Sequence, residues 1–225
     1  MHGGIVAAGQ YYAYVDIGVP ATRFTLQVDT GSTVIAVPSR QCNDCDDFVF
    51  YPLDEEHMVR FDEEPCCTSP QCRSDKKGPM PWVHSGCAFH LSYGDKSGAN
   101  GVLATDMVNL GNTSTEITFG AILDEYGPFE NSKYIDGIMG MAFPRLGCTP
   151  SCVDSFIGQL SADLSIPDSF GMCLGPNGGA MVLGGNDPDL FIGKLEYLPV
   201  RTGPAPSFPP PFKHTHTHTR AHAPT

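Results

Sequence analysis

Asp29 is the residue of this chain whose type and neighbours best suit a catalytic role. It ends an apolar stretch and is followed by Thr30, Gly31 and Ser32. The two hydroxyl groups can hydrogen-bond a carboxylate and orient it, and the glycine lets backbone approach it closely. A carboxylate held in this way could act as an acid or a base. The alternative is a turn that the aspartate merely caps, because a motif of three residues also recurs by chance.

Cysteine is the second residue type that could take part in chemistry, and the chain has 9 cysteines. Six lie between Cys42 and Cys87, and Cys148, Cys152 and Cys173 follow. The Cys-x-x-Cys spacing at the start of this cluster could bind zinc, but no second such pair follows at the distance found in zinc fingers. We therefore predict disulfides of unknown connectivity, with no metal and no cofactor. The odd number leaves one thiol, for which Cys173 is the candidate.

The composition favours a β-rich protein that does not bind nucleic acid. The 225 residues are 41% hydrophobic and 17% charged, and the 25 Gly and 20 Pro suit strands joined by tight turns. The net charge of −12 argues against DNA, any other nucleic acid or an anionic membrane as a partner, because each would repel the chain. An acidic surface also suits work at low pH, although many soluble proteins are acidic without that reason.

The cysteines predict an oxidising compartment: the secretory pathway, a vacuole or lysosome, or the outside of the cell. Residues 1–6 lack the basic start and apolar run of an export signal, and no stretch is long enough for a membrane-spanning helix. We therefore expect a mature or incomplete chain, whose full-length form could carry a signal or a membrane anchor outside this sequence. Asn112-Thr113-Ser114 is a tripeptide of the N-glycosylation type in a predicted turn.

Periodicity predicts a mostly β domain with one or two helices. Strands are expected at 10–19, 23–29, 34–37, 115–123, 134–141, 170–174, 180–184 and 194–200, and a hairpin at 88–93 and 101–108 around the turn 94–100. Residues 40–86 lack periodicity, which indicates an excursion held by disulfides. Apolar residues at helical spacing predict one helix that starts near Ser151 and ends at Pro167.

The chain changes character at about Thr202, which divides it into a domain at 1–202 and a Pro- and His-rich tail at 203–225. Nothing in the tail can form a core, so we expect it to be extended and disordered. Its alternate histidines share a face and could hold a metal ion loosely. A linker or an incorrect gene model accounts for them better.

Five segments in the expected order resemble the pepsin-like (A1 family) aspartic proteases over residues 3–200. They are the opening strands and catalytic turn at 12–39, a flap-like hairpin at 91–103, the segment 136–142, and closing strands at 181–186 and 195–200. The cysteine-rich insert and residues 169–174 lean towards plant- and protist-type members, and Cys173 would belong to that cysteine framework. The resemblance implies the amino-terminal lobe of the two-lobed, mostly β acid protease fold.

The same resemblance implies that Asp29 is one of two catalytic aspartates, one from each lobe, which share a proton and activate a water molecule against a peptide bond. The substrate would be a polypeptide in extended conformation, and inhibitors of aspartic proteases would bind the same cleft. The other site residues would support the carboxylate, form the flap and form a turn in the core of the lobe: Thr30, Gly31 and Ser32; Tyr93, Gly94 and Asp95; and Asp136, Gly137 and Gly140.

The sequence departs from the family pattern in three places. The flap tip carries Asp95 and Lys96, which could change the substrate preference. Ala36 stands where many members have a tryptophan that holds the flap tyrosine, and no second Asp-Thr-Gly or Asp-Ser-Gly follows Asp29. We therefore expect an aspartic endopeptidase of which this chain is the first lobe only, inactive alone because the second lobe is missing. The alternatives are a non-catalytic lobe that binds peptides, and a homodimer like the retroviral proteases in which each copy contributes Asp29.

Overall fold

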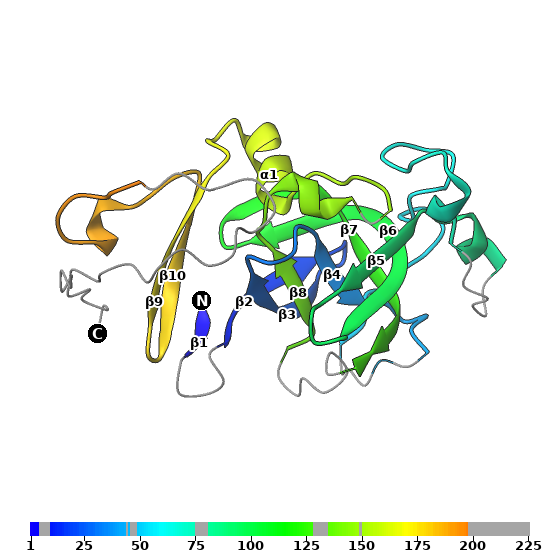
Figure 1. The fold of residues 1–225 in the computed structure, drawn as a ribbon, viewed down its shortest axis with the longest axis horizontal. Helices are drawn as coiled ribbons and strands as arrows, with labels where there is room; N and C mark the ends of the chain where they lie inside the picture. Colours follow the sequence, from blue (N-terminus) through cyan, green and yellow to red (C-terminus); the bar gives the residue numbers. More distant parts are fainter. Residues whose placement is uncertain are drawn as a thin grey trace, which may run out of the picture.

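Strands are the main regular element of the computed structural model, which describes residues 1–4, 10–43, 45, 49–74, 81–127, 135–148 and 150–197. The strands of the main sheet are β1 (His2–Gly4), β2 (Gln10–Ile17), β3 (Thr22–Asp29), β4 (Ile35–Pro38), β5 (Ala88–Ser92), β6 (Gly98–Leu110), β7 (Thr113–Tyr126) and β8 (Gly137–Gly140). They follow the order β1-β2-β3-β8-β4-β7-β6-β5, and β2 also pairs with β6 (Figure 1). The predicted mostly β lobe is confirmed. No helix in the described part of the chain is long and apolar enough to cross a membrane.

β2 and β3 pair as an antiparallel hairpin because apolar residues alternate in both. Val15 and Ile17 of β2 and Phe24 and Leu26 of β3 are fully buried. Val15 lies opposite Phe24 in the register, so the apolar side chains of both strands project from one face into the core. The strand expected at 10–19 ends two residues early, because the chain turns at Gly18, whose φ is +94°.

β4 and β8 are short strands that are buried on both faces, which explains why their sequences are continuously apolar. β8 runs parallel to β3 and antiparallel to β4, so it lies between them. Gly137 must be glycine because a Cβ atom there would collide with the carbonyl oxygen of Ala36. Close packing of these three strands therefore holds the end of β3 in place.

β5, β6 and β7 form two successive hairpins, with β6 common to both. The register between β6 and β7 shifts at Asn100/Gly101, which marks a β-bulge. The turn expected at 94–100 is shorter than predicted, since β6 already begins at Gly98. Buried side chains of these strands contribute to two apolar clusters: one contains Val102, Phe119 and Ala121, and the other contains Phe89, Leu91 and Ile122.

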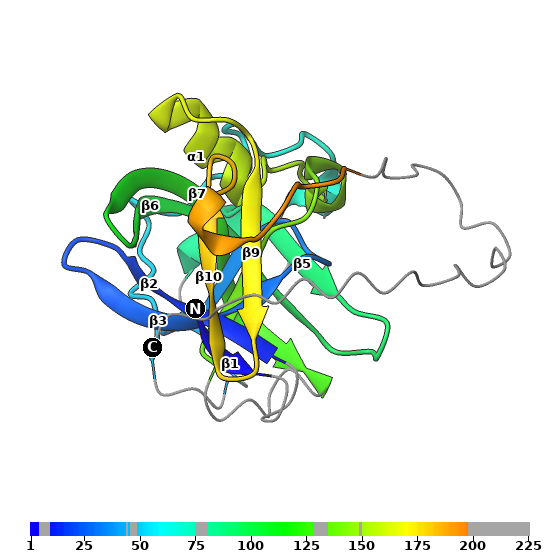
Figure 2. The same ribbon diagram turned by 90° about the vertical axis from the view of Figure 1, so that its left-hand side faces the viewer.

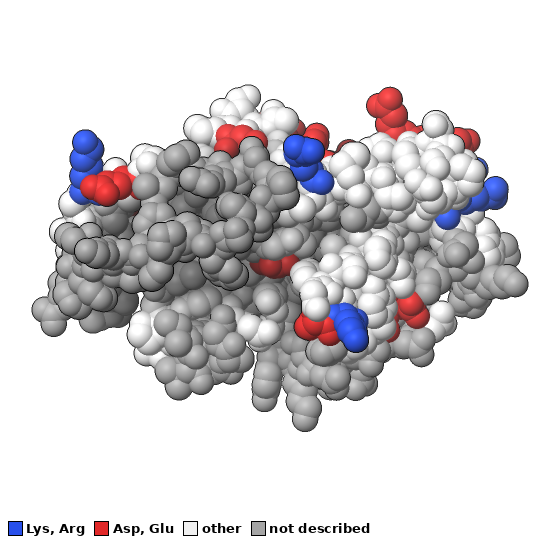
Figure 3. All heavy atoms as spheres, viewed as in Figure 1, with Lys and Arg blue, Asp and Glu red and all other residues white. Residues whose placement is uncertain are grey.

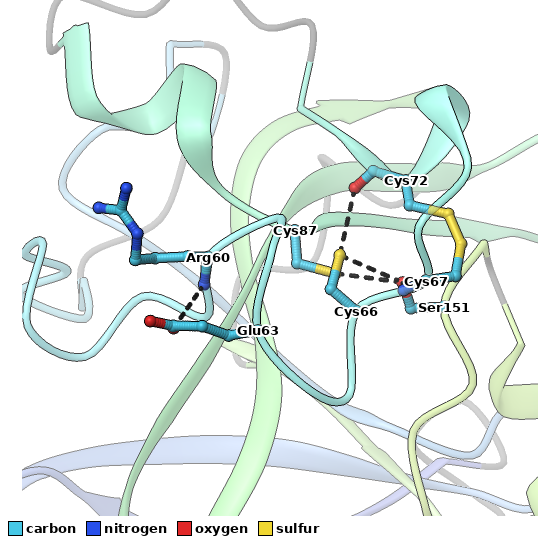
Figure 4. The surroundings of a disulfide bond; sticks show 7 residues. All are labelled: Arg60, Glu63, Cys66, Cys67, Cys72, Cys87 and Ser151. Atoms are coloured by element: carbon cyan, nitrogen blue, oxygen red, sulfur yellow. Dashed lines mark hydrogen bonds between the residues drawn. A yellow bond between two sulfur atoms is a disulfide. The ribbon is translucent and has the colours of Figure 1, made fainter.

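Disulfides hold the insert at 40–86, as the sequence predicts. The four pairs in the described residues are Cys42–Cys45, Cys66–Cys87, Cys67–Cys72 and Cys148–Cys152. Cys87 is buried directly before β5, so its bond to Cys66 fastens the insert to the main sheet (Figure 4). The hydroxyl of Ser151 accepts a hydrogen bond from the backbone N–H of Cys67 at 3.0 Å. Cys173 is the free thiol, as expected.

The helix α1 (Phe156–Leu164) begins later than the predicted start at Ser151, so that boundary was wrong. The residues before the helix make other contacts: Pro150 forms a β-bridge with Phe89 of β5, and Cys152 forms a disulfide with Cys148. The helix begins after Ser155, whose hydroxyl accepts a hydrogen bond from the backbone N–H of Gly158 at 3.0 Å. It ends at Ser165 in the left-handed conformation, before Pro167.

The hairpin of β9 (Phe170–Gly175) and β10 (Gly178–Leu183) forms a separate two-stranded sheet beside β1 (Figure 2). The backbone of Gly179 and that of Met1 exchange hydrogen bonds of 3.0 and 3.3 Å. The strand predicted at 194–200 is wrong for residues 194–197, which form no strand, and 198–200 lie outside the described residues. Tyr197 is 82% exposed. The segment forms no ladder with a described strand, although Leu195 and Tyr197 border the same hollow as residues of β9.

Candidate active site

Asp29 occupies the last position of β3, where the chain enters a tight turn between two strands of the main sheet. It lies opposite Gly140 in the parallel register of β3 and β8. The backbone N–H of Met141 donates to the carbonyl of Asp29 at 2.7 Å, and that of Ala142 donates to the carbonyl of Ser32 at 2.8 Å. Both ends of the turn are thus bonded to the segment that follows β8, which fixes the position of the Asp29 side chain.

Three donors hold the carboxylate of Asp29. The backbone N–H of Gly31 donates to Oδ1 at 2.8 Å, and the hydroxyl of Ser32 donates to Oδ2 at 2.6 Å. The hydroxyl of Tyr93, which is distant in sequence, also donates to Oδ2 at 3.1 Å. Ser32 is buried and the carboxylate is half-exposed. The arrangement presents one oriented carboxylate to a partly open surface, and the structure brings four of the predicted site residues together.

Tyr93 reaches the carboxylate from the turn between β5 and β6. Burial raises the pKa of its phenol, and although the hydrogen bond with Ser32 lowers it, the negative charge of Asp29 raises it further. The phenol therefore stays protonated and can act only as the donor towards Asp29 at any working pH of the protein. Ala36, at the position where the sequence departs from the family pattern, is fully buried in β4.

The tip of the same turn is organised by its own hydrogen bonds. Asp95 Oδ1 accepts from the backbone N–H of Ser97 at 2.9 Å and from its hydroxyl at 2.6 Å, and these bonds lower the pKa of Asp95. Lys96 follows with a φ of 72°, a left-handed conformation. A Cβ atom at Gly94 would meet nothing within 4 Å. Asp95 thus shapes the turn rather than contacting Asp29.

Thr30 lies on the exposed side of the turn, and within the described residues its hydroxyl makes no hydrogen bond. It lines a hollow of about 360 Å³ together with Met141, Phe143, Ile157 and Phe170. The structure therefore separates Thr30, which faces outward, from Gly31 and Ser32, which hold the carboxylate.

Comparison with known proteins decides the family. The model of the eukaryotic aspartyl proteases matches residues 10–210. This chain belongs to the eukaryotic aspartyl proteases. It is 30% identical to renin of Canis lupus familiaris over 203 residues and 31% identical to napsin-A of Homo sapiens over 200 residues. It is also 29% identical to rhizopuspepsin of Rhizopus chinensis over 196 residues.

These relatives are considerably longer than this aspartyl protease chain. The matches cover 86%, 85% and 85% of the chain but 44%, 42% and 44% of renin, napsin-A and rhizopuspepsin respectively. The chain thus spans less than half the length of the curated relatives it matches. The pepsin-like assignment made from the sequence is confirmed. The plant- or protist-type subgroup stays a prediction.

In this aspartyl protease chain, Asp136 has a structural role beside the turn that follows Asp29. Its Oδ2 accepts a hydrogen bond from the backbone N–H of Thr25 at 2.7 Å, and its own N–H donates to the carbonyl of Thr25 at 2.8 Å. These bonds align β8 with β3. A Cβ atom at Gly140 would lie 2.5 Å from the backbone of Thr33 and Val34. Asp136, Gly137 and Gly140 therefore position the turn and do not join the carboxylate.

Sequence reasoning missed Thr33 and the backbone donors after β8. The buried hydroxyl of Thr33 donates to the carbonyl of Phe143 at 2.9 Å, which links the turn to the segment after Met141. A small hydroxyl residue directly after the Asp-Thr-Gly-Ser motif was the available signal for Thr33. Nothing in the sequence pattern could identify the N–H groups of Met141 and Ala142, because every residue except proline has one.

Charged side chains differ in how they are placed on the face of the molecule that Figure 3 shows. Figure 3 shows one acidic group recessed near the centre of the face in view, whereas the other charged side chains there stand at the surface. In the described part of the chain, no three His, Cys, Asp or Glu side chains gather as ligands for a metal ion. The alternate histidines of the tail lie outside the described residues.

Proposed function

We propose that this chain supplies one catalytic carboxylate, that of Asp29, and the covering flap of an aspartic endopeptidase. The observation that carries the proposal is the carboxylate itself, which Gly31 and Ser32 hold by hydrogen bonds and Tyr93 covers. Membership in the eukaryotic aspartyl proteases supports peptide hydrolysis as the reaction and a polypeptide as the substrate. An extended peptide suits a site that lies between the end of β3 and the hairpin of β5 and β6.

The chemistry requires a second carboxylate opposite Asp29. Two carboxylates a few ångströms apart share one proton, since both cannot ionise cheaply, and the pair titrates as a unit. The ionised member takes a proton from a water molecule between them, while the protonated member donates to the substrate carbonyl. The hydrogen bonds from Gly31 and Ser32 would keep Asp29 aimed at that water. Thr30, on the exposed side of the turn, would brace the opposing turn.

We propose further that the 225 residues alone do not hydrolyse peptides. They contain a single Asp-Thr-Gly and no Asp-Ser-Gly, and Asp136 is engaged with the backbone of Thr25. The missing partner is a second lobe that brings its own aspartate. The presence of only one such motif also supports a second candidate function, a non-catalytic lobe that holds extended peptides under Tyr93. A homodimer in which two copies of Asp29 face each other is the third.

A cleavage assay at acid pH separates these functions. The chain alone is mixed with a fluorogenic peptide, with and without pepstatin, over a range of chain concentrations. We expect no pepstatin-sensitive turnover. Turnover that rises with the square of the chain concentration would establish the homodimer, and peptide binding without cleavage would favour the non-catalytic lobe.

The role of Asp29 is tested in a natural gene product that contains this chain together with a second lobe. We expect Asp29→Asn to lower kcat on the order of 10⁴-fold, as loss of an essential catalytic group does. Asp62→Asn is the matched control, because the Asp62 side chain is 75% exposed and lies in the insert. Equal activity of the Asp29→Asn variant and the wild type would refute the proposal.

The compartment follows from the cysteines. We propose that the protein works in the secretory pathway, in a vacuole or lysosome, or outside the cell. Four disulfides in a chain of 225 residues support this, because such bonds persist in oxidising surroundings. The boundary between a domain at 1–202 and a tail at 203–225 lies outside the described residues and stays part of the proposal.

A further inference from the structure

We propose that Asn112 is an N-glycosylation site. It lies in the two-residue turn between β6 and β7, whose last and first residues, Leu110 and Thr113, pair directly. Gly111, with a φ of +62°, occupies the first central position of the turn, as expected for the tight turns that fit twisted hairpins. Asn112 follows it and is exposed. The side-chain amide is therefore presented at the tip of a rigid hairpin.

The acceptor tripeptide is complete and solvent-accessible. Asn112-Thr113-Ser114 is the one Asn-x-Ser/Thr tripeptide with a non-proline central residue in the 225 residues. Ser114, which supplies the required hydroxyl, is exposed like Asn112. Ser114 pairs with Asn109 across the hairpin, so the segment is a regular strand that needs no rearrangement to expose the asparagine.

Two further observations support modification at this place. The four disulfides indicate passage through an oxidising compartment, where oligosaccharide transfer also takes place. The turn lies at the opposite end of β6 from the Tyr93 turn, and the 13 residues of β6 span roughly 40 Å at about 3.3 Å per residue. A bulky glycan at Asn112 would therefore leave the carboxylate of Asp29 accessible. The inference does not depend on the proposed function.

The reaction uses a lipid-pyrophosphate-linked oligosaccharide as the donor. A bond forms between Nδ2 of Asn112 and the anomeric carbon of the first sugar, while the bond from that carbon to the pyrophosphate oxygen breaks. The lipid pyrophosphate leaves with the electron pair, and a base takes the proton that Nδ2 loses. The product is a neutral amide-linked glycan on the surface of the hairpin.

The test uses translation of the whole chain, behind a cleavable export signal, in the presence of microsomes. Protease protection selects the molecules that entered the lumen, so folding is not needed for the readout. We expect these molecules to lose mass on treatment with peptide N-glycosidase F, which leaves an aspartate in place of Asn112. Asn112→Gln and Ser114→Ala should abolish the shift, whereas Ser114→Thr should retain it.

Asn109→Gln is the matched control, because Asn109 lies in the same hairpin without an acceptor tripeptide. We expect it to keep the full mass shift. Protease-protected wild-type chains whose mass does not change on glycosidase treatment would overturn the proposal. A shift that survives Asn112→Gln would overturn it as well.

Discussion

The eight-stranded sheet and the β9–β10 hairpin contain similar apolar residues, yet they are covered very differently. In β4 and β8 every residue is buried, whereas in β10 every residue is only partly buried. The hairpin packs Met181 and Leu183 against the core. The hairpin also borders a hollow of about 310 Å³ lined by Met172, Cys173 and Leu195, among other residues. Burial by neighbouring layers of structure, rather than amino-acid composition, therefore determines how stable each region is.

Loss of a large core side chain is expected to show the greatest difference between the two regions. Phe119 is fully buried and packs edge-on against Tyr51, whereas Met172 in β9 is half-exposed. We expect Phe119→Ala to lower the free energy of unfolding by about 4 kcal/mol and Met172→Ala by about 1 kcal/mol. Urea denaturation monitored by circular dichroism measures both. Equal losses would mean that the hairpin is as well covered as the main sheet.

Crowding at the turn that follows Asp29 gives the second largest effect. A Cβ atom at Gly140 would lie within 2.5 Å of backbone atoms of Thr33 and Val34, which cannot move without disturbing the turn. We expect Gly140→Ala to lower the free energy of unfolding by about 3 kcal/mol. Gly94→Ala is the control, because its added methyl group meets nothing within 4 Å, and we expect a change below about 0.5 kcal/mol. A tolerated Gly140→Ala would show that the turn is looser than the sheet around it.

The smallest effect is a pH-dependent link between the insert and the main sheet. His57 Nδ1 lies 2.7 Å from Asp54 Oδ1, and its Nε2 lies 3.7 Å from Oδ2 of the buried Asp106, which also accepts a hydrogen bond from Tyr51. Burial lowers the pKa of His57, but the hydrogen bond of Asp54 and the charges of Asp106, Asp54 and Glu56 raise it overall. The pKa of Asp54 is lowered: burial raises it, but its hydrogen bonds with His57 outweigh that effect.

The signs of these two shifts define the pH window. A raised pKa of His57 stabilises the fold below its unfolded value of about 6.5, and this contribution is lost as the pH rises through the folded value. A lowered pKa of Asp54 stabilises the fold above about 3.9 and is lost as the pH falls through the folded value. We expect His57→Gln to cost at most about 1 kcal/mol between these limits, since the pair is partly exposed.

Urea midpoints measured from acid to neutral pH check this prediction. The stability difference between wild type and His57→Gln should shrink above the folded pKa of His57. His84→Gln, in the same insert but without a carboxylate partner in the described part of the chain, serves as the control. A difference that is constant with pH would mean that His57 contributes by packing alone.

Much of the fold could be predicted from local patterns. Alternation located β2 and β3, and a continuous apolar run located β4, because burial on one or both faces leaves a direct trace in the sequence. The start of α1 and the segment 194–197 were predicted wrongly. Val153 and Leu195 have the right residue types, but Val153 packs into the cluster of β5, and Leu195 pairs with no described strand.

The site residues likewise divide into those that local patterns could predict and those that they could not. The motif at Asp29 identified Gly31 and Ser32, whose contacts with the carboxylate are local. Tyr93 came from the family resemblance, because 64 residues separate it from Asp29 and no spacing rule joins them. Asp136 was placed in a core turn, which fits its backbone contacts with Thr25. Contacts that depend on how hairpins fold over one another leave no local pattern to detect.

The hydrogen bond from Tyr93 to Asp29 has a kinetic consequence. The phenol lies against the Asp29 carboxylate, so on the proposed function a peptide could reach that carboxylate only after the turn between β5 and β6 moves aside. Binding would then take two steps, opening of the turn and entry of the peptide. The observed binding rate would level off at high peptide concentration, at the rate constant for opening of that turn.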